Sequence, residues 1–179
     1  MSERFARVNV VGVSGSGKST FAKQLAAKLD VPYVEMDALF WNPNWSESPD
    51  DVFFGRLRAA LAQPRWVIDG NYDRTVPIKW ERVTTVIWLD YSLTRTLLQG
   101  FKRAVFRAWT KPEIWPGTGN RESFRLTFFS KKSVLLWSLR SHAKLRTRYG
   151  ERMRDPAYGH IVFYRLRSPA EAQAFLRAI

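Results

Sequence analysis

The residues from Gly12 to Thr20 have the types and the spacing that hold phosphate groups in proteins. Gly12 to Ser19 fits the pattern G-x-x-x-x-G-K-[ST], and it follows a short apolar run and precedes a helical pattern, as this motif requires. The glycines allow backbone N–H groups to converge on phosphate oxygens, and the start of a helix adds partial positive charge. We therefore predict that this segment, called the phosphate loop below, binds the phosphates of ATP.

Individual side chains of the phosphate loop have expected roles in holding ATP and a metal ion. Lys18 is expected to reach the terminal phosphates, and the hydroxyl of Ser19 is expected to bind Mg²⁺. The predicted ATP-binding residues are Gly12, Ser14, Gly15, Ser16, Gly17, Lys18, Ser19 and Thr20. The chain has no cysteine and two histidines, so a metal held by oxygen atoms is expected. The alternative is a glycine-rich turn that only joins a strand to a helix.

Three aspartates end apolar runs that we expect to be strands. The carboxyl ends of parallel strands face the ligand crevice of an α/β sheet, so these side chains are expected beside the phosphate loop. We predict that Asp69 supports Mg²⁺, with Asp90 as the alternative, because Gly70 permits a substrate to approach closely after Asp69. Asp37 is a candidate to orient or deprotonate an acceptor hydroxyl, the alternative being a helix cap or a turn residue.

Two pairs of arginines have a spacing that could serve phosphoryl transfer. Arg103 and Arg107 are four residues apart and share a helix face, and Arg121 and Arg125 repeat that spacing. Guanidinium groups offset the charge on a transferring phosphoryl group and help to exclude water when a lid closes. We predict that the first pair is catalytic and that the second belongs to a lid. The alternative is a solvated basic face.

The elements that position these residues are expected to alternate between strand and helix, which predicts an α/β fold with a parallel sheet. Apolar runs typical of strands lie at residues 4–11, 32–37, 65–69, 84–90 and 160–166. Helical spacing of apolar residues is found at 19–29, 48–62, 92–105, 130–149 and 168–179. Residues 39–45 are expected to form a loop, and residues 109–130 a loop followed by helix.

Length and composition bound the architecture and the location. With 179 residues and 45% hydrophobic content, the chain fits a single domain of residues 1–179. No stretch approaches the roughly 18 consecutive apolar residues of a membrane span, and the N-terminus has no signal-peptide pattern. A cytoplasmic protein without membrane contact is therefore expected. The sequence carries no signal for an oligomeric state.

The net charge of +13 is concentrated in one part of the chain. Residues 91–154 hold 15 lysines and arginines against 3 acidic residues, whereas residues 1–90 hold 11 of each. A localised positive field indicates a polyanionic partner, either the phosphates of a small substrate or a nucleic-acid backbone. Composition leaves this choice open.

The phosphate loop, Asp37, the Asp69-Gly70 element and the arginine-rich segment occur in an order that resembles the adenylate kinase and shikimate kinase class of P-loop kinases. The likeness covers nearly the whole chain. Three stretches are more closely similar to bacterial proteins described as adenylate-kinase-related or as DNA topology modulation proteins. These stretches are Asp37-Ala38-Leu39-Phe40-Trp41, Asp69-Gly70-Asn71-Tyr72, and Trp115-Pro116-Gly117 to Asn120-Arg121-Glu122.

This resemblance implies a three-layer P-loop NTPase fold with a five-stranded parallel sheet in the order 2-3-1-4-5. It also implies an arginine-rich helical lid between the fourth and fifth strands, within residues 101–150, with Arg103 on the helix that enters it. The substrate-binding residues that it implies or supports are Asp37, Arg56, Asp69, Gly70, Asn71 and Arg74. Asn71 and Tyr72 depart from both adenylate kinases and shikimate kinases, so the acceptor of neither class carries over.

The leading hypothesis is an ATP- and Mg²⁺-dependent phosphotransferase that acts on a small-molecule or nucleotide acceptor, with catalysis by Lys18, Asp37, Arg103 and Arg107. A nucleic-acid-associated P-loop ATPase or binding protein is the alternative, motivated by the basic middle segment and its aromatic residues. A third hypothesis is that ATP only regulates association with a protein partner.

Overall fold

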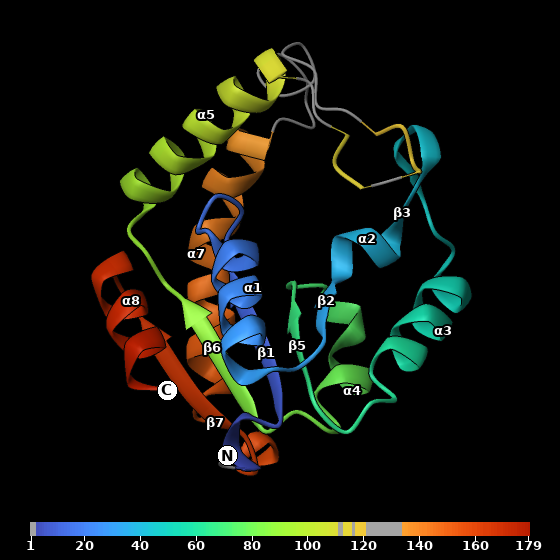
Figure 1. The fold of residues 1–179 in the computed structure, drawn as a ribbon. Helices are drawn as coiled ribbons and strands as arrows, with labels where there is room; N and C mark the ends of the chain where they lie inside the picture. The colour runs from blue at the N-terminus through green and yellow to red at the C-terminus, as the bar shows by residue number, and fades with distance from the viewer. Residues whose placement is uncertain (1–2, 111–112, 116, 121–133) are drawn as a thin grey trace.

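A parallel five-stranded sheet forms the centre of the computed structural model, which describes residues 3–110, 113–115, 117–120 and 134–179 (Figure 1). Its strands are β1 (Arg7–Gly12), β2 (Tyr33–Glu35), β5 (Trp66–Asp69), β6 (Thr85–Leu89) and β7 (Val162–Leu166). They lie in the order β2-β5-β1-β6-β7, and each neighbouring pair is parallel. Counted along the chain, this is the order 2-3-1-4-5, so the predicted α/β fold and its sheet are confirmed.

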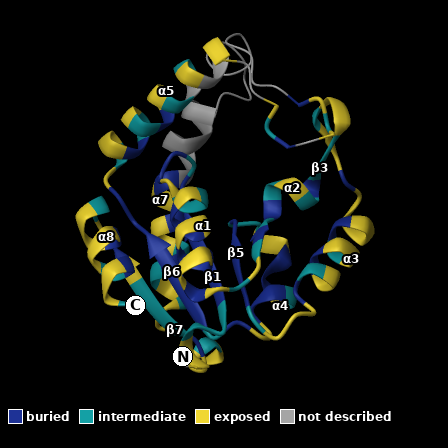
Figure 2. Cartoon of the chain, viewed as in Figure 1, coloured by how far each residue is buried: buried dark blue, intermediate teal, exposed yellow. Residues whose placement is uncertain are grey.

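Helices cover both faces of the sheet. They are α1 (Lys18–Leu29), α2 (Met36–Phe40), α3 (Asp50–Ala60), α4 (Val76–Lys79), α5 (Leu93–Thr110), α7 (Val134–Arg152) and α8 (Pro169–Ala178). Apolar residues of α1 and α8 pack on one face, and those of α3, α4 and α7 pack on the other. The central strands β1, β5 and β6 are therefore buried, the edge strands β2 and β7 are partly buried, and the outer helix faces are exposed (Figure 2). Within the described residues, no helix is long and apolar enough to cross a bilayer.

The segment after β2 differs from the expected strand and loop. Strand β2 ends at Glu35 rather than at Asp37, because its partner β5 ends at Asp69, which pairs with Glu35. Asp37 therefore lies in the first turn of α2. Residues 39–45 were expected to be a loop, but the chain forms the end of α2 and a hairpin of β3 (Trp41–Asn42) and β4 (Ser46–Glu47). Short 3-10 turns occur at Glu3–Phe5, Pro43–Trp45, Asp73–Thr75 and Pro156–Tyr158.

The carboxylate of Asp90 joins three elements beyond the end of β6. Its Oδ1 accepts from Nε of Arg146 on α7 at 2.7 Å, and its Oδ2 accepts from Nη2 of Arg165 on β7 at 2.6 Å. The guanidinium of Arg165 also lies 4.5 Å from the centre of the Trp88 ring. Because the Asp90 side chain is only 3% exposed, these partners compensate a nearly buried charge.

We expect Asp90→Asn to lower the free energy of unfolding by about 2 kcal/mol. This loss is smaller than that expected for a fully buried ion pair, because both arginines are partly exposed. Urea unfolding monitored by circular dichroism measures this change. Asp51→Asn, at an exposed position of α3, is the matched control and should cost less than about 0.5 kcal/mol. Equal stability of the Asp90→Asn protein and the wild type would contradict a structural role for the ion pairs.

Candidate active site

The phosphate loop closes around the start of α1 in a conformation that its glycines permit. Gly15 and Gly17 have φ angles of 85° and 82°, in the left-handed region that other residues disfavour. A Cβ on Gly15 would lie 2.7 Å from the carbonyl oxygen of Thr96, so the loop packs directly against α5. The predicted order of strand, loop and helix is confirmed, with the loop between β1 and α1.

Asn71 ties the phosphate loop to the segment that follows β5. Its Nδ2 donates to the carbonyl oxygen of Gly12 at 2.7 Å, and its Oδ1 accepts from the Gly12 N–H at 3.1 Å. The hydroxyl of Tyr149 donates to the same Oδ1 at 3.4 Å. The sequence predicts that Asn71 binds substrate, whereas the structure places its amide against the backbone of the loop.

Ser19 and Asp69, the predicted metal pair, are in direct contact. The Ser19 hydroxyl donates a hydrogen bond to Oδ2 of Asp69, which is 3% exposed. Burial raises the pKa of Asp69, while the charge of Lys18 and the hydrogen bond from Ser19 oppose that shift. The negative charges of Asp37 and Glu35 add to the upward shift.

Asp90, the alternative metal residue, lies beyond β6, on the opposite side of β1 from β5. Both of its carboxylate oxygens accept hydrogen bonds from arginines, as described above. Of the two strand-end aspartates, Asp69 is therefore the one placed against the phosphate loop.

The atoms around Ser19 fit a bound phosphate and an oxygen-liganded ion. A hydroxyl and a carboxylate are the kinds of ligand that Mg²⁺ prefers. The Oγ of Ser16 is buried inside the loop, and the described residues provide it with no hydrogen-bond partner. Because the described residues contain no group of three or more metal-binding side chains, phosphate oxygens and water would have to complete the coordination.

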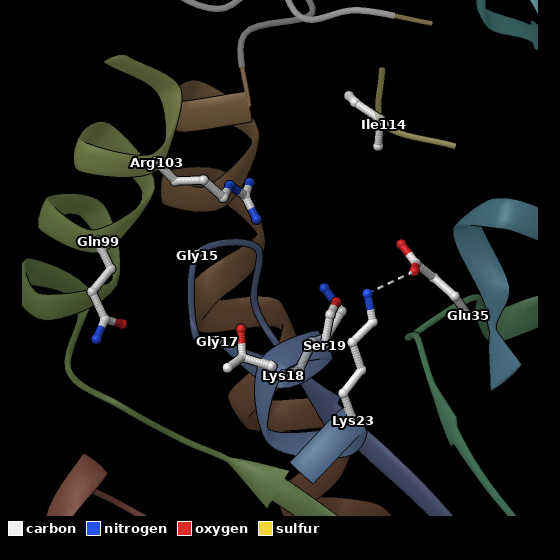
Figure 3. Close-up of a pocket in the computed structure, with 10 residues that line it drawn as sticks. Gly15, Gly17, Lys18, Ser19, Lys23, Glu35, Gln99, Arg103 and Ile114 are labelled. Carbon is white, nitrogen blue, oxygen red and sulfur yellow. Dashed lines mark ion pairs between the residues drawn. The ribbon is translucent and has the colours of Figure 1, made fainter. Parts of the chain in front are cut away.

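A pocket of about 380 Å³ opens in front of the phosphate loop (Figure 3). Its lining residues are Gly15, Gly17, Lys18, Ser19, Thr20, Lys23, Glu35, Gln99, Arg103 and Ile114. In Figure 3, Arg103 extends from α5 into the space above the loop, while Lys23 and Glu35 face each other on the side opposite α5. The pocket thus brings α5, the phosphate loop and the end of β2 together.

Of the four predicted catalytic and lid arginines, Arg103 is the one whose side chain the structure describes. Its Nη2 donates to Oγ of Ser14 at 3.4 Å, so it meets the phosphate loop across the pocket. Arg107 lies one turn further along α5. Arg121 and Arg125 lie outside the described residues, and the lid at residues 101–150 therefore stays a prediction.

Glu35 is a pocket residue that the sequence reasoning missed. Its Oε2 pairs with Nζ of Lys23 at 3.6 Å, and its Oε1 accepts from Nε1 of Trp115 at 3.0 Å. The signal that could have found it is its place at the carboxyl end of a strand. Assigning the strand end to Asp37, two residues later, concealed that signal.

Asp37 forms a short hydrogen bond with Tyr72. The Tyr72 hydroxyl donates to Oδ1 of Asp37 at 2.6 Å. Burial raises the pKa of Tyr72, and the adjacent charge of Asp37 raises it further, so the phenol remains a proton donor. This contact holds one oxygen of a half-buried carboxylate and orients the other.

Arg56 and Arg74, which the resemblance places at an acceptor site, contact the protein itself. The exposed Arg56 donates from Nη1 to three acceptors, namely the Leu39 carbonyl, Asn42 Oδ1 and Ser48 Oγ. Nε of Arg74 lies 3.3 Å from Oδ1 of Asp50, and its guanidinium stacks over Phe40 and Phe53 at 5.0 and 5.7 Å. Both arginines thus brace the segment around α2 and α3.

Lys79 is a second residue that the sequence did not indicate. It is fully buried behind the Asp69-Gly70 turn, and its Nζ donates to the carbonyl oxygen of Gly70 at 3.2 Å. A Cβ on Gly70 would lie 2.8 Å from Cβ of Met36, so Met36 packs directly against this turn. Burial lowers the pKa of Lys79 from 10.5 to about 7, with a further contribution from Arg152.

Comparisons with known proteins report on the fold. No protein-family model and no curated protein matches the chain. Among solved structures, a gluconokinase from Sinorhizobium meliloti 1021 is 19% identical over 98% of this chain and 94% of its own, with a TM-score of 0.51. This likeness shows that the two chains share a fold.

Two further structures are similar at lower TM-scores. A sugar kinase from Janibacter sp. HTCC2649 is 19% identical over 96% of this chain and 91% of its own, with a TM-score of 0.49. A shikimate kinase from Bacteroides thetaiotaomicron is 13% identical over 97% of this chain and 95% of its own, with a TM-score of 0.48. The closer resemblance to DNA topology modulation proteins finds no support in these comparisons.

The lowered pKa of Lys79 predicts a pH-dependent stability. Between pH 7 and 10 the unfolded chain keeps a proton on Lys79 that the native state has released, so stability from this group rises with pH. The free energy of unfolding of the wild type, relative to that of Lys79→Met, should therefore rise by up to about 1.4 kcal/mol per pH unit. Urea unfolding of both proteins at pH 7, 8 and 9 measures the difference. Lys144→Met, at an exposed position, is the control, and its free energy of unfolding should change with pH as that of the wild type does. The same pH dependence in Lys79→Met and the wild type would contradict the expectation.

Proposed function

We propose that this protein is an ATP-dependent phosphotransferase, which moves the terminal phosphoryl group of ATP to a hydroxyl of a small molecule or nucleotide. The observation that carries the proposal is that Lys18, Ser19 and Arg103 line one pocket, with Asp69 hydrogen-bonded to Ser19. The fold similarity to the Sinorhizobium meliloti gluconokinase supports it.

ATP is bound through the phosphate loop in this proposal. The loop amides and Lys18 hold the terminal phosphates. The buried hydroxyl of Ser16 donates a hydrogen bond to a phosphate oxygen. Ser19 and Asp69 are the residues that would hold Mg²⁺, directly or through water. The ion, when bound, neutralises charge on the phosphate oxygens and orients them.

Asp37 is the proposed base for the acceptor. Tyr72 holds its Oδ1, which leaves Oδ2 to accept the proton of the acceptor hydroxyl. The acceptor oxygen then bonds to the terminal phosphorus as the bond to the bridging oxygen breaks, and ADP leaves with that electron pair. Arg103 stabilises the charge that spreads over the transferring group.

We further propose that residues 1–179 form one kinase domain with a lid at residues 101–150. Arg107, Arg121 and Arg125 would add positive charge over the phosphates when the lid closes, and closure would exclude water from the pocket. The packing of α5 against both the phosphate loop and α7 supports a coupling between this segment and the site.

The nucleic-acid alternative rests on the basic middle segment, and part of that charge is already used within the protein. Arg146 pairs with Asp90, and Arg148 and Arg152 both pair with Asp73, at 3.6 and 2.6 Å. These contacts favour a structural role for α7 and weaken the alternative.

Lys18→Ala should raise the Kd for Mg-ATP by at least about tenfold, because a charge-assisted contact with phosphate is lost. Isothermal titration calorimetry measures this change, and Lys144→Ala is the exposed control.

The wild type should release ADP from Mg-ATP when it is offered a panel of hydroxyl acceptors. Unchanged ATP affinity in Lys18→Ala, or no acceptor-dependent ADP, would refute the proposal.

Arg103→Gln should lower kcat by about a hundredfold with little effect on the Kd for ATP, because the guanidinium acts mainly on charge that develops during transfer. Lys102→Gln is a matched control, since it removes the same charge from the neighbouring, exposed position of α5. Steady-state kinetics measure kcat for both variants. An equal loss of kcat in the two would show that only the overall positive charge of α5 is important, and not the position of Arg103.

A further inference from the structure

Tyr33 lies on the same face of the sheet as Asp69. Strand β2 pairs Glu35 with Asp69 of β5, and Tyr33 precedes Glu35 by two residues. Because alternate residues of a strand point to the same face, the side chains of Tyr33 and Asp69 share one face of the sheet. The Tyr33 ring packs there against the apolar cluster to which α1 contributes.

Helix α1 covers Tyr33 from this face. Ser19 and Lys23 are about one turn apart on α1, and both line the pocket (Figure 3). Nζ of Lys23 lies 5.3 Å from the centre of the Tyr33 ring and 3.6 Å from Oε2 of Glu35. The Ser19 hydroxyl, one turn earlier, donates to Oδ2 of Asp69. Tyr33 is therefore held at the side of the pocket where Ser19 meets Asp69.

The hydroxyl of Tyr33 has Asp69 and Ser19 as polar neighbours. Burial raises the pKa of this hydroxyl, and the negative charges of Asp69 and Glu35 raise it further. Hydrogen bonding with Asp69 adds to the upward shift of the pKa, whereas hydrogen bonding with Ser19 opposes it. The phenol therefore keeps its proton at neutral pH and is a hydrogen-bond donor.

This donor is buried, and no described residue forms a hydrogen bond of normal geometry with it. Asp69 and Ser19 thus lie near the Tyr33 hydroxyl without completing a bond in this conformation. Buried hydroxyl groups are hydrogen-bonded in most native structures, because a bond that is not made costs free energy. A donor in this state beside a carboxylate is suited to hold that carboxylate in a second orientation.

We infer that Tyr33 is a positioning residue of the proposed metal site, and that its hydroxyl donates a hydrogen bond to the Asp69 carboxylate when Mg²⁺ is bound with nucleotide. This inference rests on the proposed function, to which it adds the residue that orients Asp69. Tyr33 touches neither the phosphates nor the acceptor in this role.

The oxygens of Asp69 can accept both hydrogen bonds and still face a cation. An ionised carboxylate has about four lone-pair sites, so Asp69 can accept from Ser19 and from Tyr33 with sites left for the ion or its water. Hydrogen bonds to metal-binding carboxylates fix their orientation, and the loss of one typically weakens metal binding by roughly 10- to 100-fold. Tyr33 would thus raise the affinity for Mg²⁺ without being a ligand.

The first test measures how strongly Mg²⁺ promotes nucleotide binding. Isothermal titration calorimetry gives the Kd for AMP-PNP, a non-hydrolysable ATP analogue, in EDTA and in Mg²⁺. The ratio of the Kd in EDTA to the Kd in Mg²⁺ should fall about tenfold in Tyr33→Phe, because Asp69 loses its orienting donor. Tyr158→Phe is the matched control, since it removes a half-buried tyrosine hydroxyl from the opposite face of the sheet, and its ratio should equal that of the wild type.

Two results of this titration would overturn the inference in different ways. A wild-type ratio near one would show that Mg²⁺ does not assist nucleotide binding, which overturns the proposed metal site and the inference with it. A clear dependence on Mg²⁺ in the wild type that Tyr33→Phe keeps in full overturns the inference alone, and leaves the proposed kinase function standing.

Thermal melting separates this role of Tyr33 from a purely structural one. Without nucleotide and Mg²⁺, Tyr33→Phe should melt at the wild-type temperature or above it, because the lost hydroxyl has no hydrogen bond of normal geometry among the described residues. With Mg²⁺ and AMP-PNP, its melting temperature should rise less than that of the wild type, since weaker binding stabilises less. A lower melting temperature without ligand, together with an equal rise with ligand, would assign Tyr33 to packing alone and overturn the inference.

Discussion

The contact between Asn71 and Gly12 is the constraint on which the rest of the site depends. Two hydrogen bonds join the side-chain amide of Asn71 to the backbone of the first residue of the phosphate loop. Because Asn71 follows Asp69 by two residues, the same contact sets the end of β5 beside Ser19. Lys79 supports the turn between them from behind, through the Gly70 carbonyl. The phosphate loop and the carboxylate of Asp69 are thereby joined by direct hydrogen bonds.

Charge is divided across the pocket that this unit borders. Lys18 and Arg103 line the pocket beside the phosphate loop, and Glu35 lines its other side, where it pairs with Lys23. The same strand geometry produces both sides, because parallel strands direct their carboxyl ends to one edge of the sheet.

Residues of the same type take different roles according to their partners. Asp69 and Asp90 both end buried apolar strands, yet Asp69 meets Ser19 whereas Asp90 meets Arg146 and Arg165. The arginines divide in the same way, since Arg103 faces the phosphate loop and Arg56 faces the chain around α2. The glycine after Asp69 favours Asp69 over Asp90 as the metal residue, which agrees with the contact to Ser19, whereas no comparable signal in the sequence distinguishes the arginines.

The phosphate loop, the five strands of the sheet and their order could all be predicted, because they follow from local spacing, apolar periodicity and a resemblance that spans the chain. The fold of the whole chain decides that β2 ends at Glu35, that Glu35 lines the pocket and that Lys79 supports the Gly70 turn. It also decided that Asn71 braces the loop. The physical reason is that each of these facts depends on a partner distant in the chain, and local sequence does not record which distant groups will meet.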